Sequence, residues 1–359
     1  MKSDNAMKIN TSTVNLFIVY SPLHCLCAEQ IALSFENNAK NILFYLKPEF
    51  ESLLNITTWD SITYLPWPRF DPMPGFFGRI RQTKKNLYTV AKFCQGAQRI
   101  VLHTTVIDTE AINYYINFLR KKFPPAEFNI RLFPDGLMNI RRHPISLFKE
   151  LLQYTRLIRR IIYPEIHYYR FKGDRTGSDD LLVDKIYVLS NFPHQYNSSK
   201  VTYMPKFESL NGIGFDSILV QKRALVIGQP LIAYRRMTKE QVKIITKGIY
   251  DYLQACGIEE IFYKSHPRDN TREYALDGYK ELILSKPLEQ HLAEHPYGIV
   301  IGVCSTGLLT GRMILPNWCR VISYGINMMI FNNIKEKKEL ISIFNQLEVD
   351  IINCSNQVN

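Results

Sequence analysis

The chain has 359 residues, a formal net charge of +11 and a composition that is 46% hydrophobic and 21% charged. This composition is typical of a globular protein and excludes a collagen-like, disordered or disulfide-rich chain. The length exceeds what one hydrophobic core usually serves, so we expect two domains. The positive charge favours anionic partners: nucleic acid, an acidic membrane surface or a charged small substrate.

The seven cysteines are scattered along the chain and show no paired CxxC spacing, which argues against a zinc site and against a disulfide framework. We therefore expect a reducing, cytoplasmic setting. The apolar segments are shorter than the ~20 residues that a membrane-spanning helix needs. The first residues also lack the pattern of a signal peptide.

The first half of the chain alternates strand and helix patterns. Short apolar runs rich in β-forming residues predict strands at 14–20, 41–46, 99–105 and 128–133, and a helix-like segment lies at 79–95. Such alternation predicts a parallel α/β sheet. The strand at 128–133 leads into the turn Pro134-Asp135-Gly136, where Asp135 is either an ordinary turn residue or a working carboxylate.

The second half repeats the pattern. Strands are predicted within 223–231, 258–268, 297–303 and 319–325, and the strongest helix pattern, 238–257, ends at Gly257, a residue suited to a helix C-terminus. A shorter helix is predicted at 288–296. Residues 191–214 are rich in turn formers and lack periodicity, so we expect the linker there, with the domain boundary near residue 205.

Ligands of open α/β sheets bind at the carboxyl ends of the strands, and loops of the second half carry suitable residues there. In the loop Gly228-Gln229-Pro230 the glycine would let the backbone approach a ligand, although an ordinary β-turn explains it equally well. His266 lies between Lys264 and Arg268. The cations favour its neutral form unless an anion such as phosphate binds, and the alternative is a histidine that opens an X-Pro turn.

Ser305, Thr306 and Gly307 lie between a predicted strand and a predicted helix. Hydroxyls beside the free N–H groups of a helix N-terminus make an anion site. An ordinary helix cap, which contributes about 1 kcal/mol, is the alternative. The chain has no GxxxxGK[ST] motif, no complete GxGxxG and no Asp-x-Asp metal signature, so cations and helix termini would have to stabilise a leaving phosphate.

Six short motifs occur in order along the chain: YSPLH at 20–24, FPDG at 133–136, VTYMPKF at 201–207, VIGQP at 226–230, KSHPR at 264–268 and CSTG at 304–307. In these motifs the chain resembles the bacterial GT-B sialyltransferases, namely glycosyltransferase family 52, the lipooligosaccharide sialyltransferases, and the related polysialyltransferases. The resemblance implies an α/β fold of GT-B type, with two Rossmann-like domains facing each other across a cleft. The expected domains are an acceptor-side domain at 7–204, a nucleotide-sugar-binding domain at 205–345 and a C-terminal tail at 346–359.

The resemblance also implies an activity: inverting transfer of sialic acid from CMP-sialic acid to a hydroxyl of a cell-surface glycan, either lipooligosaccharide or capsule. It implies no metal ion and no other cofactor. Asp135 would be the general base, and His266 would assist the departure of CMP. The donor would be bound by Gly228, Gln229, Pro230, Lys264, Pro267, Glu289, Ser305, Thr306 and Gly307, and the acceptor side would hold Ser21, Pro22 and Gly136.

Two features qualify these roles. The family usually shows two acidic residues before the glycine of its acidic motif, and here the first is replaced by Pro134. Glu289 would accept from the ribose hydroxyls of the donor, but a solvated carboxylate in the first turn of a helix explains it equally well.

The segment 141–163 combines apolar residues with Lys and Arg as a basic amphipathic helix does. Such a helix lies either on an anionic membrane or, more often, against its own domain. The expected location is accordingly the bacterial cytoplasm or the inner face of its membrane. The oligomeric state is left open by the sequence, and a dimer is compatible with it.

Two other functions remain open. One is a GT-B enzyme that uses another nucleotide sugar, for example an α-glucosyltransferase. The other is a non-catalytic protein that binds glycans or nucleic acid. Nucleic acid is disfavoured because Lys and Arg are spread over both halves and no RRM, zinc-finger or helix-turn-helix pattern occurs.

Overall fold

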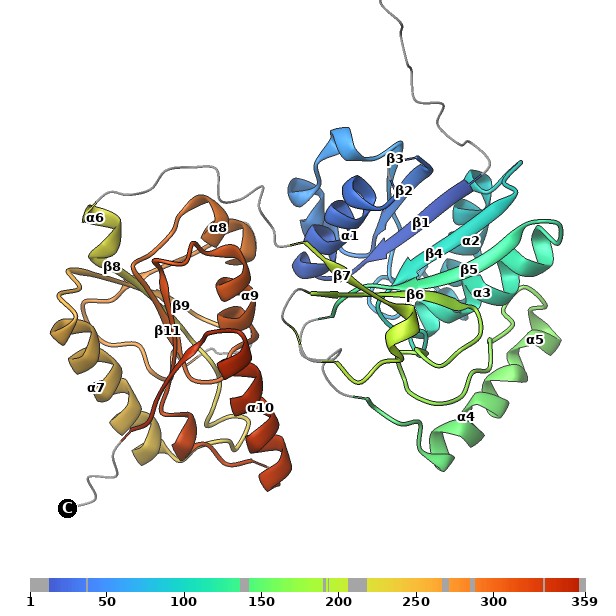
Figure 1. Cartoon of the computed structure of the whole chain (residues 1–359). Helices are drawn as coiled ribbons and strands as arrows, with labels where there is room; N and C mark the ends of the chain where they lie inside the picture. The colour runs from blue at the N-terminus through green and yellow to red at the C-terminus, as the bar shows by residue number, and fades with distance from the viewer. Residues whose placement is uncertain are drawn as a thin grey trace, which may run out of the picture. The chain divides into compact units, whose positions relative to one another are not determined.

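The computed structural model of the protein describes residues 13–36, 38–135, 142–189, 192, 194–205, 218–266, 271–284, 288–331 and 333–354. The chain divides into two compact units, shown with their element labels in Figure 1. The first comprises Met1–Leu189 with His194–Met204, and the second comprises Ser190–Pro193 with Pro205–Asn359. The expected placement of the two units across a cleft stays a prediction.

The first unit is built on a seven-stranded sheet with the order β3-β2-β1-β4-β5-β6-β7. All six pairings between neighbouring strands are parallel. Its strands and helices are β1 Thr13–Val19, α1 Pro22–Ser34, β2 Lys40–Tyr45, β3 Ser61–Tyr64, α2 Gly78–Phe93, β4 Arg99–Thr104, α3 Glu110–Lys122, β5 Glu127–Leu132, α4 Leu147–Leu157, α5 Arg159–Ile162, β6 Val183–Leu189 and β7 Val201–Met204. Short 3₁₀ helices lie at Pro48–Leu53, Ile56–Thr58 and Ser198–Lys200.

The strand order of the first sheet reverses between β1 and β4. From β1 the chain runs outward through β2 and β3, and it then returns to add β4 on the other side of β1. Right-handed crossovers in opposite directions place α1 on one face of the sheet and α3 on the other, where α2 packs beside α3. A reversal of this kind opens a crevice at the carboxyl ends of β1 and β4.

The second unit repeats this arrangement with six strands in the order β10-β9-β8-β11-β12-β13, again all parallel. Its reversal lies between β8 and β11. Its elements are α6 Ile218–Gln221, β8 Arg223–Ile227, α7 Lys239–Ala255, β9 Glu260–Lys264, β10 Lys280–Glu281, α8 Leu288–Glu294, β11 Ile299–Gly302, α9 Thr306–Ile314, β12 Arg320–Tyr324, a 3₁₀ helix Ile326–Met328, α10 Ile334–Gln346 and β13 Asp350–Ile352. Figure 1 shows α7 on one side of this sheet and α8, α9 and α10 on the other.

Local chemistry explains why these elements form where they do. Helix α7 begins with a capping box, in which the side chain of Thr238 accepts from the N–H of Gln241 and the side chain of Gln241 accepts from the N–H of Thr238. The chain leaves this helix at Gly257, whose φ of +72° suits glycine. The central strands are buried on both faces, as Leu225 and Val226 in β8 show. The main predicted strands therefore correspond to β1, β2, β4, β5, β8, β9, β11 and β12.

The structure differs from the sequence-based expectation at the sheet edges. The expected tail at 346–359 contains β13, which pairs with β12 through Ile322↔Asp350 and the next two residue pairs, so the second unit continues through this strand. The expected linker at 191–214 contains β7, which pairs with β6. Short strands of this kind are stabilised by the neighbouring strand, and they carry no long apolar run that a pattern search would find.

The amphipathic segment expected at 141–163 forms helix only from Leu147 onward within its described part. Before it, Pro144 makes an isolated bridge with Asp174. None of the helices that the structure describes is long and apolar enough to cross a membrane.

Candidate active site

The first group of candidate residues lies at the carboxyl edge of the first sheet. Tyr20 follows β1, Thr105 follows β4, and Asp135 lies three residues beyond β5. Because β1, β4 and β5 are neighbours, their ends converge beside the strand-order reversal. The side chain of Asp135 is 27% exposed, so this carboxylate can be reached from solvent.

Asp135 is held by a histidine that was not among the predicted site residues. His24 is completely buried, and its Nε2 lies 2.8 Å from Oδ1 of Asp135. The other ring nitrogen, Nδ1, accepts from the N–H of Tyr20 at 3.4 Å. The proton of a neutral His24 therefore belongs on Nε2, from which it is donated to the Asp135 carboxylate.

The first turn of α1 fixes the position of His24. Ser21 caps this helix, its side chain accepts from the N–H of His24 at 3.3 Å, and Pro22 occupies the first helical position. Ser21 and Pro22, predicted on the acceptor side, thus lie at the edge that holds Asp135. His24 ends the motif YSPLH, and a histidine in the first helical turn after a central strand is the signal that could have revealed it.

Tyr20 packs beside this pair as an uncharged side chain. Its ring meets the ring of His24 edge-on at 4.4 Å and that of Trp67 at 5.4 Å. Its hydroxyl is hydrogen-bonded to Thr105. Burial, together with the charge of Asp135, raises the pKa of Tyr20 well above its usual value, so the phenol stays protonated.

Trp67 connects this edge to a basic groove. A cavity of about 930 Å³ is lined by Trp67, by neighbouring residues before and within α2, by the start of α3 and by α4 and α5. Six of its lining residues are cations and two are carboxylates, a net charge of +4 if all are ionised (6 − 2). The cations are Arg69, Arg79, Lys149, Arg156, Arg159 and Arg175, and the carboxylates are Asp108 and Glu110. Such a groove suits an anionic ligand.

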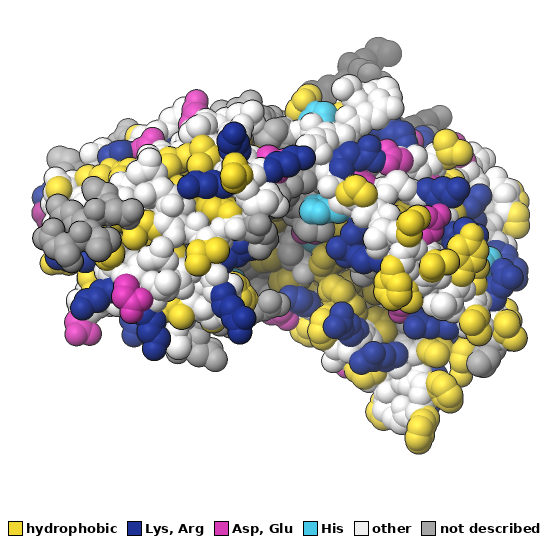
Figure 2. Space-filling model, turned by 90° about the horizontal axis from the view of Figure 1, so that it is seen from below, with side chains coloured by type: hydrophobic (Ala, Val, Ile, Leu, Met, Phe, Trp, Pro, Cys, Tyr) yellow, Lys and Arg dark blue, Asp and Glu magenta, His cyan; other side chains and the backbone are white. Residues whose placement is uncertain are grey.

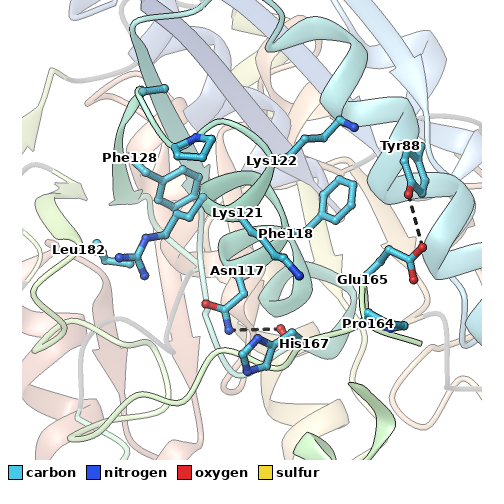
Figure 3. A pocket seen from close by; sticks show the side chains of 13 residues that line it. Tyr88, Asn117, Phe118, Lys121, Lys122, Phe128, Pro164, Glu165, His167 and Leu182 are labelled. Atoms are coloured by element: carbon cyan, nitrogen blue, oxygen red, sulfur yellow. Dashed lines mark hydrogen bonds between the residues drawn. The ribbon is translucent and has the colours of Figure 1, made fainter. Parts of the chain in front are cut away.

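A second cavity of the first unit, of about 720 Å³, contains none of the predicted site residues. Figure 3 shows its lining, with Asn117, Lys121 and Lys122 from α3 and Phe128 from β5. Phe128 and Leu182 lie at the amino ends of β5 and β6. This cavity is therefore at the opposite edge of the sheet from Asp135.

In the second unit, the loops after β8, β9 and β11 meet at one edge, because these three strands are adjacent. The side chain of Gln229 crosses the strand-order reversal, and its Oε1 accepts from the N–H of Cys304 at 2.7 Å. This hydrogen bond ties the loop 228–230 to the residues that precede Ser305. Burial raises the pKa of the Cys304 thiol to about 12, so this cysteine is a protonated thiol rather than a nucleophile.

His266 follows β9 at the same edge and is half-buried. Lys264 is the last residue of β9, and its Nζ donates to the carbonyl of Ser265 at 2.9 Å. Burial lowers the pKa of Lys264. A partly desolvated ammonium group of this kind interacts strongly with an anion that reaches it.

Ser305 caps α9, and its side chain accepts from the N–H of Gly307 at 3.1 Å. Thr306, the first helical residue, is exposed. The capping interpretation of Ser305 is thus confirmed, whereas its role as a phosphate ligand stays a prediction. A Cβ on Gly307 would lie 3.0 Å from the side chain of Leu288, which shows that the start of α8 packs here.

That contact brings Glu289, in the first turn of α8, to the same region. Burial raises the pKa of the Glu289 carboxyl. The residue is nevertheless partly exposed in the first turn of α8, so both expected roles of Glu289 stay predictions. Packing also explains why position 228 is a glycine, because a Cβ there would lie 2.5 Å from the Tyr263 hydroxyl.

The predicted donor residues that the structure describes thus gather at one edge of the second sheet. Gly136 and Pro267 lie outside the described residues. Asp135 belongs to the first unit and His266 to the second, so the expectation that the two side chains face each other stays a prediction.

Within the described part of the chain, no group of three or more His, Cys, Asp or Glu side chains could hold a metal ion. The expectation that the reaction needs no metal ion likewise stays a prediction.

Two Rossmann-like units, each with its polar residues at a strand-order reversal, define the GT-B class, and the protein is a glycosyltransferase of this class. Residues 15–318 match the alpha-2,8-polysialyltransferase family, and the chain belongs to that family. The sequence-based resemblance to sialyltransferases is confirmed at this level, whereas membership of family 52 stays a prediction.

Other comparisons give distant likenesses. No curated protein matches the chain. Among solved structures, UDP-GlcNAc 2-epimerase from Methanocaldococcus jannaschii is 13% identical with a TM-score of 0.49, covering 97% of this chain and 94% of that one. The kitacinnamycin glycotransferase is 9% identical with a TM-score of 0.47, covering 96% and 87%. The calicheamicin glycosyltransferase CalG4 is 9% identical with a TM-score of 0.47, covering 96% and 86%.

Proposed function

We propose that the protein transfers sialic acid from CMP-sialic acid to a hydroxyl of an acidic cell-surface glycan, with inversion and without a metal ion. The observation that carries the proposal is the pair His24–Asp135, a buried histidine donating to a solvent-accessible carboxylate at the strand-order reversal of the first sheet. A carboxylate oriented in this way is suited to act as a general base.

In the proposed reaction the acceptor hydroxyl loses its proton to Asp135 as its oxygen bonds to the anomeric carbon of the sialyl group. The bond from that carbon to the phosphate oxygen breaks, and its electron pair leaves with CMP. The role of His24 is to orient the carboxylate, because its Nε2–H occupies Oδ1 of Asp135 at 2.8 Å. General-base catalysis of this kind contributes roughly 10²- to 10⁴-fold.

The departing CMP phosphate accumulates negative charge, and the edge of the second sheet offers groups that stabilise it. We assign to His266 the donation of a proton or hydrogen bond, and to Lys264 a charge interaction. The exposed hydroxyl of Thr306 and the N-terminus of α9 would hold the phosphate oxygens. Gln229 would position these loops, because its side chain accepts from the N–H of Cys304.

The acceptor is expected to occupy the basic groove of the first unit. Trp67 lines the groove and also contacts Tyr20, which in turn contacts His24, so the groove leads toward Asp135. The family name specifies an α2,8 linkage, for which the acceptor hydroxyl belongs to another sialic acid. An acidic acceptor of that kind matches the net positive lining of the groove.

Donor selection is the experiment that tests this proposal. We expect CMP and CMP-sialic acid to raise the thermal unfolding midpoint, whereas UDP and UDP-glucose leave it unchanged. The variant Asp135→Asn should keep this shift, because Asp135 lies in the other unit from the donor residues, and should lose CMP release in the presence of acceptor. Asp251→Asn removes an exposed carboxylate of α7 that pairs with Lys247, and it serves as the matched control. Stabilisation by a UDP-sugar but not by CMP would overturn the sialyl assignment.

A further inference from the structure

The outer face of α4 and α5 is apolar. Five large hydrophobic side chains on it are between 61% and 81% exposed, namely Leu147, Phe148, Leu151, Ile158 and Ile161. Four of them recur with helical spacing on one stripe, which Tyr154 extends. These helices are the green pair at the lower right of Figure 1.

The opposite, polar face of these helices is the one that contacts the protein. Gln153 is only 2% exposed, and its side chain exchanges two hydrogen bonds with the backbone of Phe171, each at 3.3 Å. Arg156 donates to the Tyr168 hydroxyl at 2.7 Å, and Arg159 pairs with Glu110 at 2.8 Å. The helices are therefore oriented opposite to an ordinary surface helix, which buries its apolar side.

Aromatic residues before α2 lie near the end of α5. The ring of Phe77 lies 6.5 Å from that of Tyr163, which follows α5, and Phe76 beside it is 94% exposed. Phe77 has a φ of +62°, a conformation that costs energy for a residue other than glycine. Phe77 also lines the basic groove, on the side of α4 and α5 that lies opposite the apolar stripe.

Three exposed cations belong to the same segment of the chain, namely Arg160, Arg170 and Lys172. The other cations of this segment, Lys149, Arg156 and Arg159, line the basic groove and pair there with Asp108 or Glu110. Arg170 lies over the ring of Tyr154 at 3.7 Å, and Arg160 is exposed beside Ile161. In the right-hand part of Figure 2, hydrophobic and Lys or Arg side chains alternate over the surface, and few Asp or Glu side chains are in view.

An anionic lipid bilayer fits this surface better than a second copy of the chain. Two copies packed through the same face would bring two positively charged rims together, which is repulsive. An anionic bilayer accepts the apolar side chains between its lipids and places lipid phosphates beside the cations. The mode is interfacial, in keeping with described helices that are too short or too polar to span a membrane.

We propose that the outer face of α4 and α5 docks on the surface of an anionic lipid bilayer. This docking would hold the basic groove, one wall of which is formed by α4 and α5, next to acceptors anchored in that bilayer. The proposal does not depend on which sugar the enzyme transfers, so it can fail or succeed separately from the proposed function.

Sedimentation with vesicles tests the proposal. The full-length protein is mixed with vesicles of phosphatidylcholine alone, or of phosphatidylcholine with phosphatidylglycerol, and the bound fraction is measured. The triple variant Leu147→Gln/Leu151→Gln/Ile158→Gln removes apolar side chains that are already exposed, so its folding should be preserved. The matched control is Ile56→Gln/Leu181→Gln/Ile334→Gln, which changes residues that are between 75% and 98% exposed elsewhere.

We expect the wild type and the control to bind anionic vesicles, and the triple variant to bind at least about tenfold more weakly. The double variant Arg160→Gln/Arg170→Gln should also weaken binding, and more so at low salt. Vesicles without the anionic lipid should bind about tenfold less wild-type protein. Equal binding of the triple variant and the wild type would overturn the proposal. So would a wild-type dimer in light scattering that the triple variant abolishes while neither binds vesicles, because a second copy would then cover this face.

Discussion

At the scale of single residues, the first unit contains two buried histidines to which we assign different roles. His24 donates to Asp135 and contacts the region where the acceptor is proposed to bind. His103 lies deeper in the same sheet, between the rings of Phe17 and Tyr187, with centroid separations of 4.0 Å and 6.2 Å. One is expected to affect turnover and the other stability, and each can be tested alone.

Replacing His24 should lower turnover without abolishing folding. In His24→Phe the donor to Asp135 is lost, so the carboxylate is no longer oriented, and we expect kcat to fall by about tenfold or more. His24→Gln can still donate from its side-chain amide and should recover part of kcat. The KM for the donor should stay unchanged in both, since the residues proposed to bind the donor lie in the other unit. A rise in donor KM with unchanged kcat would contradict this role.

His103 should make the protein less stable in mild acid. Burial, and then the charges of Arg131 and Lys185, hold its pKa well below the ordinary 6.5. Below that pH the unfolded chain binds a proton that the folded chain does not, so the free energy of unfolding falls by up to about 1.4 kcal/mol per pH unit. Urea unfolding between about pH 7.5 and about pH 5.5 measures the slope.

The variant His103→Phe isolates this effect, because it keeps an aromatic ring between Phe17 and Tyr187 and has no group to titrate. Its unfolding free energy should depend less on pH than that of the wild type. Identical slopes for the two proteins would show that His103 is not the group responsible.

At the scale of elements, two features of the second unit have a structural role besides any role in binding. The cap of α9 is one, and the close packing of the β8 loop against β9 is the other. Both involve residues that the sequence places in the donor site. Stability and binding must therefore be measured separately.

Variants of Ser305 and Thr306 should separate the contribution to stability from the contribution to binding. Ser305→Ala removes the cap of α9 and should cost about 1 kcal/mol of unfolding free energy, whereas Ser305→Asn restores a capping side chain. Thr306→Ala, at an exposed position, should change stability by less than about 0.5 kcal/mol. Titration with CMP should nevertheless show weaker binding for Thr306→Ala. Binding equal to that of the wild type would exclude Thr306 from the phosphate site.

Gly228 and Tyr263 should show coupled effects on stability. Gly228→Ala would place a Cβ 2.5 Å from the Tyr263 hydroxyl, and we expect a cost of about 1–3 kcal/mol from overpacking. Tyr263→Ala removes a buried ring at a cost of about 3–5 kcal/mol. In the double variant the alanine at 228 no longer clashes. Its loss of unfolding free energy, measured by chemical denaturation, should therefore be smaller than the sum of the losses in the two single variants by more than about 0.5 kcal/mol. Simple additivity would show that packing against Tyr263 is not what requires this glycine.

At the scale of the whole molecule, the elements that could be predicted from the sequence were the central strands and the long helices. Buried parallel strands read as apolar runs, so β1, β4, β8 and β11 could be located, and with them the loops that follow. Edge strands such as β7 and β13 escaped notice because their partners, rather than their own residues, define them.

The same reasoning explains what was missed in the site. The pairing of His24 with Asp135 joins residues 111 positions apart in the sequence, and it follows only from the strand order that places β1 and β5 on either side of β4. The outward apolar face of α4 has a related cause. An amphipathic pattern gives the direction of the stripe on the helix but not which side meets the protein.

The transfer reaction itself tests the account most directly. The protein is incubated with CMP-sialic acid and oligosaccharides that end in sialic acid or in a neutral sugar, and products are identified by mass spectrometry. We predict addition of sialic acid to the sialylated acceptors, reduced by roughly 10²- to 10⁴-fold in Asp135→Asn and also reduced in His266→Ala. Full activity of Asp135→Asn, or transfer from a different nucleotide sugar with none from CMP-sialic acid, would contradict the account.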